Sequence, residues 1–446
     1  MNTPICDFVT QYAESDFLRT HMPGHKGVVL TGAEPRDITE IAGADSLYEA
    51  DGIIRESEKN AGMLFGADTF YSTEGSSQCI RAMVYLAALY ARQRGNAPKI
   101  LAGRNVHKTL LSAVALCDLE VDWLTSEKRI SYLSCPIDAE TVEMALQAME
   151  EKPAAVYLTS PDYLGNLMPI GSIAEVCHRH GVLLLVDNAH GAYQKFLSES
   201  SHPMDLGADI CCDSAHKTLP ALTGAAYLHV AHDAPEFLHS HAKTAMAMFG
   251  STSPSYLILQ SLDAVNGYLA DGYRERLAEF VQLVDALKSR LKDHGYILCG
   301  QEQTKVVIDA KAYGYTGDTM AAILLKEKIA VEFADPDFLV MMVTPETGEG
   351  GLRRLEAALC AIPRRESVLE APPAFLLPKR VMPVRQAAMS LCEVVDASES
   401  LGRVLAAATV GCPPAVPIVV CGERIDEAAL RCFAYYGIER CTVVIE

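Results

Sequence analysis

The segment from Asp213 to Pro220 constrains the fold of this chain more than any other feature. It reads Asp-Ser-Ala-His-Lys-Thr-Leu-Pro, so Lys217 closes a Ser-x-His-Lys pattern. Thirty residues before this lysine, an apolar run over 181–186 ends in Asp187. Open α/β sheets build ligand sites from polar residues at the carboxyl ends of their parallel strands. The spacing therefore predicts an α/β fold in which a lysine and a strand-end carboxylate share one site.

These residues are the central parts of a pyridoxal 5'-phosphate (PLP) site. PLP chemistry needs an amine to hold the aldehyde as a Schiff base, a carboxylate to keep the pyridine nitrogen protonated, and donors for the phosphate. Lys217, Asp187, and Ser214 with His216 match these roles in that order. A carboxylate that only caps the strand end is the alternative for Asp187, and the Ser-x-His-Lys segment favours the cofactor.

Two more features fit a cofactor of this kind. Ser76 and Ser77 lie in a hydroxyl-rich turn before a helical pattern, where free backbone N–H groups and the helix dipole favour an anion. His107 follows the predicted strand 100–103, from where it can stack on a cofactor ring. The alternatives are an ordinary serine N-cap and a structural histidine. The lysine downstream favours the cofactor in both cases.

Short β-rich runs alternate with helical patterns, which is typical of α/β layering around a largely parallel sheet. The predicted strands are 100–103, 155–159, 182–187, 210–213 and 225–230. The predicted helices between them are 76–94, 138–149 and 172–180.

The later part of the chain indicates a division into domains. A long helical region over 256–294 is predicted to break near Gly267 and Gly272, and strand patterns resume at 305–309. A proline-rich stretch over 363–383 is typical of a linker or an extended crossing segment. The predicted domains are a large PLP-binding domain with an N-terminal arm, a small α/β domain and a C-terminal domain, over 1–290, 291–370 and 371–446.

Composition narrows the class of protein. Half of the residues are hydrophobic, but the apolar runs are far shorter than the roughly 20 residues that a membrane span needs. The formal charge of −19 disfavours nucleic acid and anionic membranes as partners. No secretory pattern opens the chain, and the 14 scattered cysteines lack zinc or redox spacing, so a cytoplasmic protein with reduced thiols is expected.

Other catalytic motifs are weak or missing. The stretch from Ser214 to Lys217 also satisfies S-x-x-K, but the S-D-N and K-T-G motifs of β-lactamases do not accompany it. The chain has no G-x-S-x-G elbow, no H-E-x-x-H helix and no Walker A loop. The H-x-H pairs at 178–180 and 239–241 lack ligand-like partners, and no metal site is predicted.

Motifs in order over nearly the whole chain resemble the ornithine/lysine/arginine decarboxylase family, in its short form. The opening His-Met-Pro-Gly-His-Lys-Gly at 21–27 is similar to the family's T-P-G-H-K-G. Further similar segments are Ser-Thr-x-Gly-Ser-Ser at 72–77, Arg-Asn-x-His-Lys at 104–108, Thr-Ser-Pro at 159–161, Val-Asp-x-Ala-His-Gly-Ala at 186–192, Ala-His-Lys-Thr-Leu-Pro at 215–220, Thr-Ser-Pro-Ser-Tyr at 252–256, and the prolines 413, 414 and 417 with Gly-Glu at 422–423.

The resemblance implies PLP fold type I, with a mostly parallel central sheet in the large domain and smaller C-terminal α/β domains. It also implies a reaction: a basic amino acid (arginine, lysine or ornithine) loses CO₂ through a Lys217 aldimine and a quinonoid. The products would be agmatine, cadaverine or putrescine, as in polyamine biosynthesis. In this family Thr252 and Ser253 imply a homodimer with shared active sites. The residues that the resemblance assigns to the cofactor are Ser76, Ser77, His107, Asp187, His190, Ser214, His216 and Lys217, with Thr252 and Ser253 reaching the cofactor of the neighbouring subunit.

The chain departs from the family pattern in the substrate-facing parts. Asn188 and Tyr193 replace a glutamate and a histidine, and Tyr48 stands where histidine is usual. Glu74 places an acid beside the predicted phosphate site, which is unfavourable unless it points away or meets a cation. These departures leave open another fold-type I reaction, such as transamination, elimination or racemisation, and a non-catalytic PLP-binding paralogue.

A basic substrate needs a carboxylate for its distal cation, because a buried charge without a partner is costly. The candidates from sequence are three acids of the early loop, namely Asp45, Glu49 and Asp51.

Overall fold

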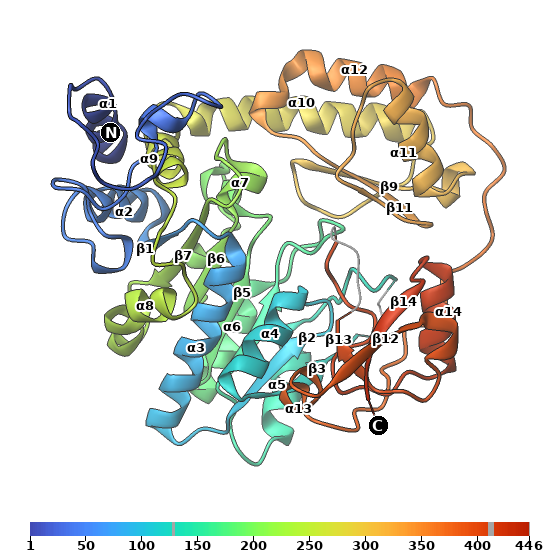
Figure 1. The fold of residues 1–446 in the computed structure, drawn as a ribbon. Coiled ribbons are helices and arrows are strands. Elements are labelled where there is room, and N and C mark those ends of the chain that lie inside the picture. Colours follow the sequence, from blue (N-terminus) through green and yellow to red (C-terminus); the bar gives the residue numbers. More distant parts are fainter. Residues whose placement is uncertain (127–129, 409–413, 446) are drawn as a thin grey trace.

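The computed structural model describes residues 1–126, 130–408 and 414–445 and contains three β-sheets (Figure 1). A seven-stranded sheet forms the centre of the large unit. A four-stranded sheet and a three-stranded sheet follow it along the chain. Among the described residues, no helix is both long and apolar enough to cross a membrane.

The large sheet has the strand order β1-β7-β6-β5-β4-β2-β3. Its strands are β1 (Ala67–Ser72), β2 (Lys99–Gly103), β3 (Glu120–Leu124), β4 (Ala155–Thr159), β5 (Leu183–Asp187), β6 (Ile210–Asp213) and β7 (Ala226–Ala231). Strand β7 runs antiparallel to both of its neighbours, and the other paired strands are parallel. The mostly parallel sheet is confirmed, and the predicted strands over 155–159 and 210–213 coincide with β4 and β6.

Both faces of this sheet are buried, which explains why its strands are apolar without alternation. In β5, Leu183 and Leu185 join the core against α3, α4 and α8, whereas Leu184 and Val186 join the core against α5 and α6. The helices of the large unit are α1 (Pro4–Ala13), α2 (Ile53–Phe65), α3 (Ser76–Arg94), α4 (Lys108–Cys117), α5 (Ala139–Ala148), α6 (Ile170–His180), α7 (Ala215–Thr218), α8 (Glu236–Met248) and α9 (Tyr256–Ala270).

A long helix, α10 (Tyr273–Asp293), leads into the second unit. The break before it is at Gly272, whose φ of +67° suits glycine. The break predicted near Gly267 is wrong, because that glycine lies inside α9. The second sheet has the order β10-β11-β9-β8, and its elements are β8 (Leu298–Cys299), β9 (Lys305–Asp309), α11 (Gly317–Lys326), β10 (Phe333–Ala334), β11 (Phe338–Met342) and α12 (Gly348–Cys360).

The proline-rich stretch runs extended to the C-terminal unit, as predicted. This last unit holds a sheet of order β12-β14-β13, and its elements are α13 (Val384–Ala388), β12 (Cys392–Asp396), β13 (Leu405–Ala407), α14 (Glu427–Tyr435) and β14 (Arg440–Val444). It lies beside β2 and β3 (Figure 1). The domain limit predicted at 290 falls inside α10, and the division into domains stays a prediction.

Candidate active site

A pocket of about 530 Å³ opens where the carboxyl ends of β4, β5 and β6 meet. The turn at the start of α3 closes one side of the pocket, and the segment 414–416 of the C-terminal unit closes another. The structure brings eight of the ten residues predicted to bind the cofactor into its lining, namely Ser76, Ser77, His107, Asp187, His190, Ser214, His216 and Lys217.

Lys217 lies in the short helix α7, directly after β6, and its amine faces His190. The distance from Lys217 Nζ to His190 Nε2 is 2.9 Å. On the other side of the ring, Lys305 Nζ donates to His190 Nδ1 at 3.2 Å and forms a buried ion pair with Glu302 at 2.8 Å. Since Nδ1 accepts a hydrogen bond, a neutral His190 carries its proton on Nε2 and donates it to Lys217. In this arrangement Lys217 accepts a hydrogen bond from His190 as an uncharged amine.

Burial supports this assignment. It lowers the pKa of Lys217, while the charge of Asp187 acts in the opposite direction. Burial is also the main cause that holds the pKa of His190 well below its ordinary value. An uncharged lysine beside a neutral imidazole is the state in which the amine can act as a nucleophile.

Asp187 ends β5 and is 2 % exposed. One of its oxygens, Oδ2, accepts from the Tyr157 hydroxyl at 3.1 Å, and Oδ1 accepts from the backbone N–H of Ala189 at 3.2 Å. These bonds hold the carboxylate at the floor of the pocket, where a buried anion favours a cationic partner. Asp187 is placed as its predicted role requires.

His107 follows β2 and serves two purposes. Its Nδ1 accepts the backbone N–H of Thr109 at 3.2 Å, so the side chain caps α4. The same ring lines the pocket. Burial lowers the pKa of His107 to about 4, although the charge of Asp187 acts against this shift. A neutral, fixed ring is suited to stacking on a flat cofactor. The structural role that was the alternative for His107 is compatible with this, because one ring can cap α4 and line the pocket.

The start of α3 offers an anion site. Gly75 has φ +73° and ψ 177° and precedes the first turn, where backbone N–H groups have no helical partner. The Ser214 hydroxyl donates to the Ser76 hydroxyl at 2.9 Å, which draws β6 and α3 together at this point. His216 Nδ1 donates to the Ala225 carbonyl at 2.9 Å, so its Nε2 is left for a ligand.

Glu74 also lines the pocket, but its carboxylate has a partner. Its Oε1 accepts the backbone N–H of Ser251, which ties the start of α3 to the segment over 251–256. Thr252 and Ser253 in this segment are exposed and lie outside the pocket lining of their own chain. Of the cofactor residues named from sequence, these two alone are not brought to the site.

The three acids predicted to bind the substrate do not line this pocket of their own chain, and their role in substrate binding stays a prediction. Asp45 is buried, and its carboxylate accepts backbone N–H groups from Ser46, Asp51, Gly52 and Ile54. It therefore organises the loop before α2, where a side-chain oxygen is needed because the first N–H groups of a helix have no helical partner. Glu49 and Asp51 point from the same loop and are exposed.

Two of the positions at which the chain departs from the family pattern lie behind the pocket. Asn188 donates to Asp213 Oδ1 at 2.6 Å, and both residues are fully buried. A glutamate at this position would face a buried carboxylate, so the amide suits its surroundings. Tyr193 is packed in the apolar core between α9, α10 and β7. Neither change removes a group from the pocket.

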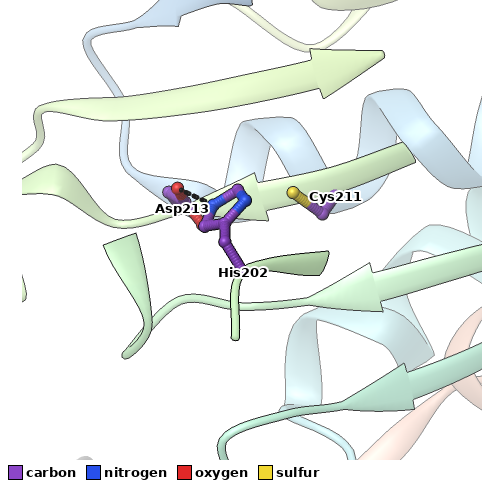
Figure 2. Close-up of side chains that lie close together, drawn as sticks. All are labelled: His202, Cys211 and Asp213. Carbon is purple, nitrogen blue, oxygen red and sulfur yellow. Dashed lines mark hydrogen bonds and ion pairs between the residues drawn. The ribbon is translucent and has the colours of Figure 1, made fainter. Parts of the chain in front are cut away.

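A buried group of His202, Cys211 and Asp213 lies close enough to suggest a metal (Figure 2). Hydrogen bonds already use the ligand atoms of His202 and Asp213. Asp213 Oδ2 accepts from His202 Nε2 at 2.9 Å and from His229 Nε2 at 3.1 Å. Burial alone would raise the pKa of Asp213, but these histidines outweigh it and hold that pKa well below its usual range. We interpret the cluster as a structural support for the end of β6.

Sequence reasoning missed Glu332, and it noted Pro414 only as part of a motif without placing the segment 414–416 at the pocket. Glu332 precedes β10, and its Oε1 accepts from the Tyr163 hydroxyl at 2.8 Å within the pocket lining. Lys108 donates its backbone N–H to Ala415 O at 2.8 Å, which fixes the C-terminal segment over the pocket. The motif containing Pro413 lies partly outside the described residues. No local pattern marks Glu332, because only the packing of the second unit against the first brings it to the site.

Comparisons with known proteins agree with this geometry. Residues 3–312 match the family model described as Orn/Lys/Arg decarboxylase, major domain. The chain is 30 % identical to the arginine decarboxylase of Halalkalibacterium halodurans over 461 residues, which cover 96 % of this chain and 92 % of that protein. It is also 30 % identical to the arginine decarboxylase of Bacillus subtilis over 465 residues, which cover 95 % and 91 %.

Solved structures show the same fold. A lysine decarboxylase from Francisella novicida superposes with a TM-score of 0.79 at 18 % identity, over 99 % of this chain and 81 % of that one. A serine palmitoyltransferase from Sphingomonas wittichii, at 14 % identity, has a TM-score of 0.57 over 80 % and 83 %. The predicted fold class, PLP fold type I, is confirmed.

Proposed function

The chain belongs to the Orn/Lys/Arg decarboxylase family, and we propose that it removes the α-carboxyl group of a basic amino acid with PLP held in the Lys217 pocket. Membership of the family makes the chain a decarboxylase. The observation that carries the proposal is the convergence of an uncharged lysine, a strand-end carboxylate and a helix start on one pocket.

The residues of the pocket fit PLP on chemical grounds. Lys217 offers the amine, Asp187 a buried anion for a protonated ring nitrogen, and the start of α3 a set of N–H donors for a phosphate. Thr159 Oγ1 is buried with no hydrogen-bond partner and lies in the same lining, so the pocket presents a polar atom that awaits a ligand. When bound, PLP supplies a sink for the electron pair that decarboxylation leaves on the α-carbon.

The chain's own residues position the substrate and move protons. Lys217 Nζ lines the pocket, where it would hold PLP and, as a free amine, could return a proton to the substrate. His190 Nε2 holds Lys217 on one side, and Lys305 fixes the ring from the other. His107 covers the pocket and limits the orientations open to a bound ligand, because only one orientation of the scissile bond delivers its electrons productively.

Glu332 is the carboxylate that we propose for the distal cation of the substrate. It lines the pocket, and its hydrogen bond from Tyr163 leaves its second oxygen free of any bond that the structure shows. A charge-assisted bond from an ammonium or guanidinium group would offset the desolvation of the substrate's cation. Glu332 takes the role for which the early-loop acids were first considered.

We also infer a homodimer with shared sites. Thr252 and Ser253 are exposed on their own chain, while Glu74 holds the segment that carries them. The exposure of this hydroxyl pair, on a segment that is tied to the start of α3, supports the inference. The family resemblance supports this role.

The reaction itself is tested with PLP-loaded protein and arginine, lysine and ornithine in parallel, with CO₂ and amine measured by mass spectrometry. We expect at least one of the three to give equal amounts of CO₂ and agmatine, cadaverine or putrescine. A keto acid without CO₂ would instead identify a transaminase. Binding of PLP without turnover of any amino acid would identify a non-catalytic paralogue.

Replacing Glu332 tests the substrate class. Glu332→Gln should lower kcat/KM for the basic substrate by about tenfold, because a hydrogen bond to a charged group contributes about 1.5–3 kcal/mol. Norleucine, which lacks the distal cation, should be used equally poorly by both proteins. The measurement is, for each protein, the ratio of kcat/KM for the basic substrate to kcat/KM for norleucine.

Glu49→Gln is the matched control, since Glu49 is an exposed acid outside the pocket lining. In Glu49→Gln, the ratio of kcat/KM for the basic substrate to kcat/KM for norleucine should equal that of the unmodified protein. If Glu332→Gln affected both substrates alike, or if Glu49→Gln shifted the ratio instead, the role proposed for Glu332 would be wrong.

A further inference from the structure

A second, smaller pocket lies beside the active site. Its volume is about 160 Å³, and it is bounded by the start of α11, the turn between β10 and β11, and two parts of the C-terminal unit. Pro414 and Val416 line both this pocket and the active-site pocket. The two spaces are therefore neighbours that share a wall.

Asp335 is the notable group of this pocket. Its Oδ1 accepts the backbone N–H groups of Asp337 and Phe338 at 2.8 and 2.7 Å. Its Oδ2 is buried and has no hydrogen-bond partner, although the residue is only 5 % exposed and lines the pocket. An unpartnered buried carboxylate oxygen is costly, and a bound cation would remove that cost.

The other walls suit an organic cation. Tyr132, Phe333 and Tyr436 present aromatic rings to the pocket, and the rings of Tyr132 and Tyr436 are 4.7 Å apart between centroids. Aromatic faces attract ammonium and guanidinium groups through the ring quadrupole. Asp318, at the start of α11, adds a second carboxylate at the more exposed side.

The cation nearest in the fold is already engaged. Lys311 Nζ forms an ion pair with Asp337 Oδ1 at 3.0 Å, and the hydroxyls of Tyr435 and Tyr436 donate to the two oxygens of Asp337. Asp337 is thus satisfied within the protein, whereas Asp335 is not. The contrast between these two neighbouring acids points to a ligand for Asp335.

We propose that this pocket is a second binding site, for a small organic cation that carries a protonated amine or a guanidinium group. The cation would bind Asp335 Oδ2 directly and stack against Tyr132 and Tyr436. The site is separate from the Lys217 chemistry and does not depend on the proposed substrate. A basic amino acid and an amine product share the required chemistry.

The test uses full-length protein in which borohydride has fixed PLP onto its lysine, titrated with methylguanidinium chloride by calorimetry. Sodium chloride at the same ionic strength is the reference. We expect saturable binding that Asp335→Asn weakens at least about tenfold, since a charge-assisted bond is lost. Asparagine keeps the oxygen that accepts the two N–H groups, so the turn is expected to fold.

Glu332→Gln separates the two pockets, because Glu332 lines the active-site pocket and not the second pocket. This variant should bind methylguanidinium as the unmodified protein does. Asp318→Asn should weaken binding by only about threefold, because Asp318 is more exposed than Asp335. The proposal would be overturned if Asp335→Asn bound normally, if binding were lost in Glu332→Gln, or if sodium chloride gave the same heats.

Binding should also depend on pH. Burial raises the pKa of Asp335 to about 7, with smaller contributions from Asp337 and Asp318. Burial also raises the pKa values of Tyr132 and Tyr436, so both phenols stay neutral over the range tested. The ionised fraction of Asp335 rises from about a tenth at pH 6 to about nine tenths at pH 8, so affinity should rise about tenfold over this range. Equal affinity at both pH values would contradict the role of Asp335.

Discussion

Lys217→Ala is expected to leave a folded protein without decarboxylase activity. Its amine is the uncharged group that His190 holds at 2.9 Å within the pocket. Without it, none of the described residues that line the pocket offers an amine to carry PLP covalently or to return the proton to the substrate. Loss of turnover should therefore be complete, and the absorbance of lysine-bound PLP should disappear with it.

Lys326→Ala is the control, because Lys326 is an exposed lysine at the end of α11. This variant should keep the activity and the absorbance of the unmodified protein. Circular dichroism should show the same secondary structure in the unmodified protein and in both variants. A yellow, active Lys217→Ala protein would show that Lys217 neither carries PLP nor is needed for turnover.

Glu423→Gln is expected to cause the largest loss of stability. Arg104 and Glu423 form an ion pair at 2.8 Å whose side chains are 1 % and 3 % exposed. Removing one charge of such a pair leaves the other buried without compensation, which costs about 3–5 kcal/mol. The pair joins the loop after β2 to the C-terminal unit, so the segment 414–416 should detach from the pocket first.

The structure supplies a probe for this change. The guanidinium of Arg104 lies 4.9 Å from the ring of Trp123, and the chain has one tryptophan. The fluorescence of Trp123 during urea unfolding should therefore report the loss of stability in Glu423→Gln and the weakened contact between Arg104 and Trp123. Glu393→Gln breaks a more exposed pair with Arg403 in the same unit and should cost less than about 1 kcal/mol. Equal losses in the two variants would contradict the structural role of Arg104 and Glu423.

Most of the pocket lining around Lys217 was predictable because its residues carry local signals. Asp187 ends an apolar strand, Lys217 follows the next strand, and Ser76 starts a helix. The carboxyl ends of parallel strands meet at one edge, so local order along the chain becomes proximity in space. The same reasoning predicted the fold class and most of the strands of the central sheet.

The substrate-facing part was not predictable in this way. Asp45 was considered because it is an acid in an early loop, but its oxygens satisfy the backbone before α2. Glu332 reaches the pocket only through the packing of the second unit, and nothing in its neighbourhood along the chain marks it. The break expected at Gly267 failed for a related reason, since packing of α9 in the core outweighs the weak helix propensity of one glycine.

The most direct test of the central claim is to locate PLP on the chain. The loaded protein is reduced with borohydride and digested, and the modified peptide is sequenced by mass spectrometry. The account predicts a pyridoxyl group on Lys217. A pyridoxyl group on Lys305, whose amine lies on the other side of His190, or on any other lysine would contradict it.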